Sequence, residues 1–344
     1  YKAVRFFASI AFLSIGSFLY FILGRHFSGS NLICWSYRVP RLPMIRRAAF
    51  PLIKRMVDRA QASGENPILT SFLNTHRYGF DEKTKQKYLR DVMVLKAPAE
   101  REKGVLIVKY TPSFEVFMCL TDVDRMANDY YIVLEPSWAG YCDPSILIFA
   151  STRSTVFVQC FTDDDFEFIR DLGCNLDPIQ LGPADWKYPR RFAEAPVKEK
   201  VYDLIMVANW APYKQHDKLI SALAKIEGRS LQVLLVGFPW GGRSRADILR
   251  MVERCNNENV RYRIEESRSL DEVASDLQKS KIFALLSRKE GDNKALVEAL
   301  FSDVPAIVFK DSIGGATSRI NRHTGILSGY EDLHENILYL SLIH

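Results

Sequence analysis

Apolar runs of strand length alternate with helical patterns from residue 103 to the end of the chain, and this alternation limits the possible folds most. The runs are GVLIVKY, YYIVLEP, SILIFA, TVFVQCF and LDPIQLG, then VYDLIMVAN, LQVLLVG, NVRYRIE, KIFALL and PAIVF. Strands that are apolar throughout belong to parallel sheets with both faces covered. The sequence therefore predicts an α/β fold with two Rossmann-like, doubly wound domains facing a cleft.

We expect four segments along the chain. Residues 1–30 contain a hydrophobic segment, residues 31–102 form a basic amphipathic segment and a linker, and residues 103–198 and 199–344 form the two α/β domains. The break between the domains is expected in residues 181–200, which are rich in proline and charge. The chain ends soon after a helical pattern, so we also expect that a closing C-terminal segment is missing.

The charge of the chain is unevenly distributed. The whole chain carries 46 Lys and Arg against 41 Asp and Glu, but residues 1–60 contain ten basic residues and a single acidic residue, Asp58. The rest of the chain is therefore net acidic. A nucleic-acid-binding protein usually has a basic face on its folded body, so we expect no nucleic-acid partner.

The six cysteines are widely spaced, with no C-x-x-C and no Cys/His cluster of zinc-binding spacing. We expect free thiols in a reducing compartment and no metal site. No G-x-G-x-x-G follows the first strand of either predicted domain, which argues against a nicotinamide or flavin cofactor.

Residues Phe6–Leu23 form a run of 18 residues without a charge. This length is sufficient for a membrane-spanning helix, and the alternative is a buried helix of the core. Lys2 and Arg5 precede the run, whereas five arginines follow it within residues 24–47. Since basic flanks stay on the cytoplasmic side, we expect a membrane-associated protein whose folded body lies in the cytoplasm.

The basic segment that follows predicts an amphipathic helix opening at Pro51. Basic residues occupy one side of this helix. Two interpretations remain open: the helix lies on an anionic lipid surface, or it packs on the domain as an ordinary surface helix. Its apolar side would consist of Leu52, Ile53, Met56, Val57 and Ala60.

Two glutamates, Glu290 and Glu298, stand eight residues apart between the predicted strands KIFALL and PAIVF. Ligands of an open parallel sheet bind beyond the carboxyl ends of its strands, which is where we expect Glu290. Gly291 allows the backbone to approach a ligand closely, and Asp292 or Asn293 can cap the helix that follows.

The first amides of that helix are hydrogen-bond donors for a phosphate, and Lys294 adds a positive charge. Glu298 lies more than one turn into the helix, where its carboxylate can accept hydrogen bonds from two vicinal hydroxyls, such as those of a ribose. Lys214 precedes the helix that follows the first strand of this domain, and it can meet a diphosphate from the opposite side. Together these features suit a nucleotide-sugar.

These elements resemble the retaining glycosyltransferases of the GT-B type, and within them glycosyltransferase family 4. The E-x7-E motif of the family matches Glu290 and Glu298, in S-x-x-E-G followed by V-E-A-L and V-P-A-I-V. The first loop matches as V-A-N-W-A-P-Y-K-Q-H-D, with Lys214 at the family's phosphate-binding lysine, and LLVGFP matches the V-G strand end at Gly237. The resemblance covers residues 200–325, and over residues 103–198 it rests on architecture alone.

The resemblance implies an enzyme that transfers a sugar from a nucleotide-sugar, such as a UDP-, GDP- or ADP-sugar, with retention at the anomeric carbon. We expect a glycan or a lipid-linked acceptor, the latter because an anchored enzyme and a lipid-linked acceptor would share the membrane plane. It implies no cofactor and usually no metal. Glu298 would hold the ribose, Glu290 would contact the sugar, and Lys214 would neutralise the leaving diphosphate. Charge develops on that diphosphate in the transition state, so cations fixed there would contribute to catalysis.

The sequence departs from the family pattern at two places. The arginine that the family often pairs with the lysine falls at Asn209, so the donor site lacks one cation, for which Lys294 or Arg288 could compensate. The histidine that the family often places in its N-terminal domain has no counterpart, because residues 103–198 contain no histidine.

An acceptor pocket is expected after the strand YYIVL, in the loop that begins with Glu135. Ser137, Trp138 and Tyr141 could shape this pocket, and ordinary loop packing is the alternative for all four residues.

Three functions compete at this point. The first is a membrane-associated glycosyltransferase, the second is a nucleotide-sugar epimerase, and the third is a GT-B-like protein that binds its ligand without turnover. We expect the first. Asn209 and the missing histidine keep the third open, and hydrolysis of a nucleotide-sugar by the protein would exclude it.

Overall fold

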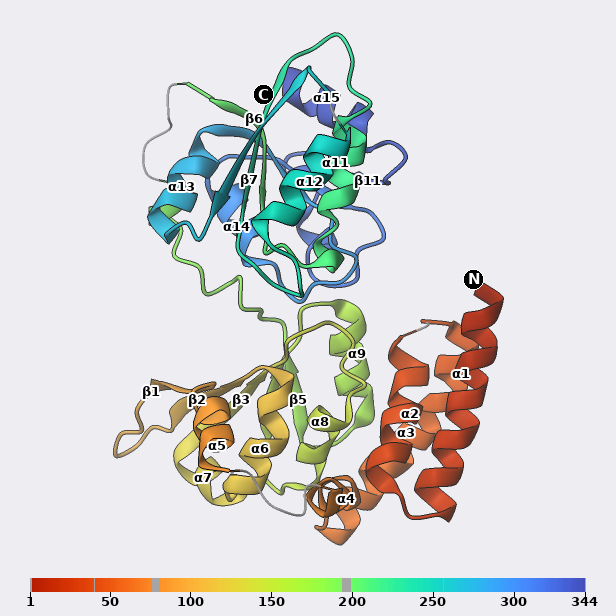
Figure 1. Ribbon diagram of the computed structural model, residues 1–344. Helices are drawn as coiled ribbons and strands as arrows, with labels where there is room; N and C mark the ends of the chain where they lie inside the picture. The colour runs from red at the N-terminus through yellow and green to blue at the C-terminus, as the bar shows by residue number, and fades with distance from the viewer. Residues whose placement is uncertain (1, 40, 76–80, 194–198, 256, 344) are drawn as a thin grey trace. The chain divides into compact units, whose positions relative to one another are not determined.

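The computed structural model describes residues 2–39, 41–75, 81–193, 199–255 and 257–343. The chain divides into two compact units, Tyr1–Gly182 and Pro183–His344, and each is described by itself (Figure 1). The boundary lies inside the predicted linker of residues 181–200, so the C-terminal unit begins earlier than the predicted residue 199. Residues 194–198 of that linker, and residues 40 and 76–80 of the predicted segment 31–102, lie outside the described residues.

The N-terminal unit contains a group of helices followed by an α/β layer. Its first helices are α1 (Lys2–Ser17), which continues as a π-helical turn (Phe18–Ile22), α2 (His26–Arg38), α3 (Pro43–Ser63), α4 (Pro67–Thr75) and α5 (Glu82–Leu89). The later helices are α6 (Phe114–Leu120), α7 (Val123–Asp129), α8 (Pro144–Leu147) and α9 (Asp163–Leu172). The strands are β1 (Val92–Lys96), β2 (Gly104–Lys109), β3 (Tyr130–Glu135), β4 (Val156–Gln159) and β5 (Leu176–Ile179).

These strands form one sheet in the order β1-β2-β3-β4-β5, in which β1 is antiparallel to β2 and the other neighbours are parallel. The predicted parallel sheet is present. However, its parallel strands follow one another in chain order, without the reversal that defines a doubly wound sheet, so that part of the prediction is wrong for this unit.

The run SILIFA, predicted as a strand, is helical and forms most of α8 and the 3-10 turn Ile148–Ser151. Asp143 caps this helix by accepting a hydrogen bond from the backbone N–H of Ser145, and Pro144 occupies its first turn. Both features favour a helix start over a strand.

Residues 31–102 contribute to the core of the N-terminal unit and are not only a linker. Helix α3 begins at Pro43, with Pro51 inside it. Its apolar side packs into the same core cluster as the sheet residues Leu106 and Ile132, so the helix packs on the domain and does not offer this side to a lipid surface. The residues of this side in the cluster are Ile53, Met56 and Val57, with Leu52 at its margin, and Ala60 is buried as well.

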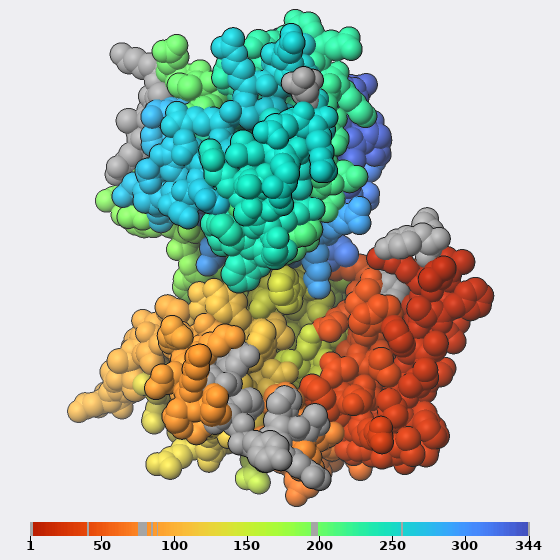
Figure 2. Space-filling view, in the orientation of Figure 1, coloured from red at the N-terminus to blue at the C-terminus, as the bar shows by residue number. Residues whose placement is uncertain are grey.

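Helix α1 packs against α2 and leaves its other side exposed. At the contact, a Cβ atom on Gly16 would lie 2.9 Å from the carbonyl oxygen of Gly29, so the small residues allow close approach. Residues Ala3–Ile22 form a helical segment that is long and apolar enough to cross a membrane, and 17% of its apolar stretch is buried in the protein. The core helices of soluble proteins and signal sequences can be equally long and apolar. The helix lies at the surface of the unit (Figure 2), and its exposed side chains include Val4, Phe7, Ile15, Phe18 and Ile22.

The C-terminal unit is the doubly wound domain that the sequence predicts. Its strands are β6 (Tyr202–Val207), β7 (Leu231–Gly237), β8 (Val260–Glu266), β9 (Ser280–Leu285), β10 (Ala306–Phe309) and β11 (Gly325–Ser328). Its helices are α10 (Arg190–Ala193), α11 (His216–Leu223), α12 (Arg245–Cys255), α13 (Leu270–Gln278), α14 (Lys294–Phe301) and α15 (Leu333–Ile343).

All six strands are parallel and lie in the order β11-β10-β9-β6-β7-β8. Counted along the chain, this is the Rossmann order 3-2-1-4-5-6. The five predicted strands of this unit are confirmed, and β11 adds a sixth that the sequence did not indicate.

Candidate functional site

The C-terminal sheet has a topological switch point between β6 and β9. From β6 the chain winds toward β7 and β8, and from β9 it winds in the opposite direction toward β10 and β11. The loops that leave the carboxyl ends of β6 and β9 therefore diverge, and a ligand can bind between them. These loops, residues 208–215 and 286–293, carry Lys214 and Glu290.

Lys214 and Glu290 form an ion pair between the two loops, in which the Lys214 Nζ donates a hydrogen bond to the Glu290 Oε1. Only 11% and 12% of these side chains are exposed. Lys214 ends the 3-10 turn Pro212–Lys214, and Gln215 then adopts a φ of 64° before α11 begins. The structure thus brings together the two residues predicted to be catalytic.

The segment after β10 holds the loop of Glu290 in place. The backbone N–H of Glu290 donates to the carbonyl oxygen of Ile313 over 2.9 Å, and the N–H of Gly315 donates to the carbonyl oxygen of Gly291 over 3.0 Å. Gly314 has a φ of 133°, and a Cβ atom there would clash with the carbonyl oxygen of Glu290. Only glycine fits this contact at position 314. The backbone of Gly291 is thus hydrogen-bonded to the segment after β10.

Asn293 is the residue that caps α14, because its Oδ1 accepts a hydrogen bond from the N–H of Leu296 over 2.8 Å. Asp292 has a different task. Its carboxylate accepts hydrogen bonds from Arg319 Nε at 3.0 Å and Nη2 at 2.8 Å, and from the N–H of Ala184 at 2.9 Å. Burial raises the pKa of Asp292, and Arg319 opposes this shift. Asp292 therefore anchors the loop, and its role in donor binding stays a prediction.

Glu298 lies in α14 with 5% of its surface exposed, and it forms an ion pair with Lys187. Lys187 is not among the predicted site residues, and it lies more than a hundred residues away in the predicted linker. No local signal marks this pair, because a lysine in a polar segment is usually solvated. Lys294 is the first residue of α14.

Gly237 and Asn209 have local explanations in the structure. A Cβ atom on Gly237 would clash with the carbonyl oxygen of Ala208 and with the indole of Trp210, so this glycine is needed for packing between the loops after β6 and β7. Asn209 Oδ1 accepts a hydrogen bond from the N–H of Ala211 over 3.2 Å, within its own loop. Neither contact tests the predicted roles of these residues in donor binding.

His216, the first residue of α11, was also missed. It is fully buried beside Trp210, with ring centroids 5.2 Å apart, and neither ring nitrogen has a hydrogen-bond partner among the described residues. Burial, and secondly the positive charges of Arg243 and Lys214, lower the pKa of His216 to about 4. The imidazole is therefore neutral near pH 7.

The residues predicted for an acceptor pocket lie in the loop after β3, in the N-terminal unit. Ser137 exchanges two hydrogen bonds with Thr111, through its Oγ at 3.1 Å and its N–H at 3.2 Å. Glu135 is buried, with the Lys109 Nζ at 3.7 Å. Tyr141 is buried and its hydroxyl donates to the carbonyl oxygen of Gln159. Trp138 is half exposed and alone presents a large surface to solvent.

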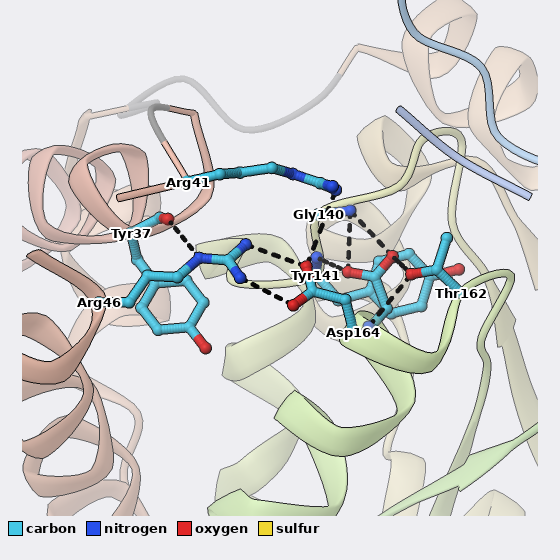
Figure 3. A network of polar contacts seen from close by, with 8 residues as sticks. Tyr37, Arg41, Arg46, Gly140, Tyr141, Thr162 and Asp164 are labelled. Atoms are coloured by element: carbon cyan, nitrogen blue, oxygen red, sulfur yellow. Dashed lines mark hydrogen bonds and ion pairs between the residues drawn. The ribbon is translucent and has the colours of Figure 1, made fainter. Parts of the chain in front are cut away.

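A polar network ties this loop to the N-terminal helices (Figure 3). Asp165 at the start of α9 accepts hydrogen bonds from the N–H groups of Gly140 and Tyr141, at 2.9 and 2.8 Å. Its neighbour Asp164 accepts two hydrogen bonds from Arg46 of α3, at 2.7 and 3.0 Å. The basic residues of the N-terminal segment thus stabilise the loop after β3.

A surface cavity of about 510 Å³ is lined by Tyr188, Arg190, Arg191, Asp271, Ala274, Ser275 and Gln278. It contains none of the predicted site residues, and the ion pair between Arg191 and Asp271 at 3.2 Å crosses it. The described residues contain no group of three or more His, Cys, Asp or Glu that could hold a metal ion. All six cysteines are free, as the sequence predicts.

Residues 188–338 match the family model of Glycosyl transferases group 1. The match covers nearly all of the C-terminal unit, including Lys214, Glu290 and Glu298, and less than half of the chain. No curated protein matches the chain by sequence.

Solved structures share the fold. TarM from S. aureus, a mutant in complex with fondaparinux, alpha-GlcNAc-glycerol and UDP, is 18% identical with a TM-score of 0.52, over 69% of this chain and 48% of that chain. HepE from Anabaena, in complex with UDP and glucose, is 15% identical with a TM-score of 0.51, over 69% and 67%. The α/β fold with parallel sheets thus matches GT-B glycosyltransferases, and the chain spans about half the length of TarM.

The buried His216 predicts a loss of stability in acid. The unfolded chain binds a proton with an ordinary pKa of 6.5, and the folded chain only near pH 4, so the stabilisation is complete above pH 6.5 and falls as the pH drops toward 4. His216→Phe should remove this dependence. Between pH 7 and pH 5 the wild type should lose about 2 kcal/mol more unfolding free energy than the variant.

Urea unfolding of the full chain at the two pH values measures this difference. His323→Phe, at an exposed histidine, is the matched control and should behave as the wild type. An equal loss in wild type and His216→Phe would show that His216 is not held neutral.

Proposed function

We propose that this protein is a glycosyltransferase that moves a sugar from a nucleotide-sugar donor bound at the switch point of the C-terminal unit. One observation carries the proposal: the Lys214–Glu290 pair lies at the switch point of a unit that matches the Glycosyl transferases group 1 model. Membership of glycosyltransferase family 4 and retention at the anomeric carbon are part of the proposal. So is independence from metal ions.

The ion pair is the resting form of the site. When the donor binds, its diphosphate becomes the partner of Lys214, and the first amides of α14 and Lys294 add further donors. As the glycosidic bond breaks, negative charge accumulates on the diphosphate. A cation already fixed in place stabilises that charge more in the transition state than in the ground state.

Release from Lys214 leaves Glu290 facing the sugar. Positive charge grows on the anomeric carbon as the bond to the diphosphate breaks, and a carboxylate beside it stabilises that charge. Glu298 accepts hydrogen bonds from the ribose hydroxyls, while Lys187 compensates its buried negative charge and fixes its orientation. The two glutamates therefore act at different stages of the reaction.

The acceptor is a glycan or a lipid-linked sugar held by the N-terminal unit, where the exposed Trp138 offers an apolar surface. A lipid-linked acceptor agrees with the exposed apolar side of α1. We propose that this side inserts into the membrane and that the basic residues of the N-terminal segment lie on its cytoplasmic side. UDP-, GDP- and ADP-sugars all remain candidates for the donor.

A second candidate function is donor binding without turnover. Asn209 stands where the family often has an arginine, and both glutamates are paired with lysines in this structure. Release of free sugar or nucleoside diphosphate from a nucleotide-sugar by the wild-type protein would exclude this candidate. An epimerase would instead convert the donor into its epimer without releasing the diphosphate.

Substitutions of the two glutamates should have different kinetic effects. Glu290→Gln should lower kcat by about 100-fold or more with little change in donor affinity, because its charge acts in the transition state. Glu298→Gln should mainly raise the KM for the donor, because contacts to the ribose are equal in both states. Steady-state kinetics with the donor that most raises the melting temperature would measure both effects.

Glu253→Gln, on the exposed side of α12, is the matched control and should leave kcat and KM unchanged. Wild-type kinetics in both Glu290→Gln and Glu298→Gln would contradict the site and with it most of the proposed function.

Membrane association can be tested on the exposed side of α1. Phe7 and Phe18 are 68% and 53% exposed, so Phe7→Glu with Phe18→Glu should fold and fail to float with vesicles that contain anionic lipid. Tyr339→Glu, at an exposed aromatic residue of α15, should float as the wild type does. Flotation of the α1 variant at the wild-type level would show that this helix is not the anchor.

A further inference from the structure

The first loop of the proposed donor site provides one positive charge where two are expected. It contains Lys214 but has Asn209 in place of a second cation, and a donor diphosphate carries about two negative charges. Of the substitutes that the sequence suggested, Lys294 lies on the other loop, at the start of α14. A further cation on a neighbouring loop would supply the second charge.

The loop after β7 lies next to the loop of Lys214, because β7 is the neighbour of β6 in the sheet. It contains a tight turn in which Trp240 and Arg243 exchange two backbone hydrogen bonds, at 3.1 and 3.2 Å. Gly241 and Gly242, with φ of 61° and 77°, allow this turn. A Cβ atom on Gly241 would lie 3.2 Å from the Cβ of Ala211, so the turn packs directly on the loop of Lys214.

Arg243 is placed at the end of this turn without a carboxylate partner. Its Nη1 is buried and has no hydrogen-bond acceptor, and the guanidinium forms no ion pair with any described residue. The acidic residue nearest to Arg243 in sequence is Asp247, and its carboxylate accepts hydrogen bonds from the N–H of Ser244 and from Arg250. A buried guanidinium nitrogen without an acceptor costs stability unless a ligand supplies one.

His216 links the two cations in space. It is the first residue of the helix that follows Lys214, and the positive charges of both Lys214 and Arg243 act on its buried ring. The ring is neutral and accepts no hydrogen bond from Arg243. The ring therefore neutralises neither cation.

We propose that Arg243 is the second diphosphate-binding cation of the donor site, taking the place of the arginine that is absent at position 209. This inference rests on the proposed function and names a residue outside the predicted motifs. Lys214 and Arg243 reach the diphosphate from the loops of neighbouring strands. A charge-assisted contact of this kind is worth about 10- to 100-fold in affinity.

Calorimetric titration of the full chain with UDP, GDP and ADP, and with the corresponding nucleosides, tests the proposal. Arg243→Gln should weaken binding of the preferred diphosphate by about 10- to 100-fold and leave the weak nucleoside binding unchanged. Arg245→Gln is the matched control, because Arg245 is exposed and donates to the carbonyl oxygen of Ile264 at 3.3 Å. It should bind as the wild type does.

A second variant keeps the test independent of folding defects. In the Arg243→Gln background, Asn209→Arg should restore at least about 10-fold of the lost affinity, because it returns a cation to the same phosphates. Diphosphate binding by Arg243→Gln at the wild-type level would overturn the role of Arg243 and leave the proposed function intact. Equal loss of diphosphate and nucleoside binding, or no rescue, would also overturn it. A wild type that binds no diphosphate would overturn both.

Discussion

The ion pair between Lys214 and Glu290 joins the two loops that diverge at the switch point of the C-terminal sheet. Both charges are almost completely buried, so each depends on the other to offset its loss of hydration. Such pairs contribute little net stability compared with apolar packing. A buried pair has a function when a ligand replaces one of its partners, because the remaining charge is already desolvated and can act strongly on the ligand.

The surrounding structure restricts the freedom of both loops. Gly314 allows the segment after β10 to contact the backbone at Glu290, and Gly237 allows the loops after β6 and β7 to pack closely. Asp292, Arg319 and Ala184 form a second connection behind the site. Charges held in this way need little rearrangement during a reaction, which is the condition under which fixed charges accelerate it.

Much of the fold could be predicted from the sequence, because apolar runs bounded by turns mark strands wherever both faces of a sheet are buried. SILIFA was misassigned because a short apolar run fits a buried helix equally well, and only the cap at Asp143 separates the two. The strand order of the N-terminal unit could not be predicted, because the hydrophobic periodicity of a sequence marks strands and does not tell which strands are neighbours. At the site, the order of motifs predicted that Lys214 and Glu290 lie on opposite sides of one ligand, whereas neither their ion pair nor Lys187 had a signal in the sequence. Arg243 could have been found from the glycines of WGGR after a strand.

Exchange of the two charges tests most directly whether the Lys214–Glu290 pair is a ligand site or only a structural bridge. Lys214→Glu with Glu290→Lys keeps an ion pair at the switch point and reverses its direction. Calorimetric titration of this double variant with the nucleoside diphosphate that the wild type binds is the measurement. We expect the melting temperature to stay close to that of the wild type and the affinity to fall by about 100-fold. Wild-type affinity in the exchanged protein would contradict this account.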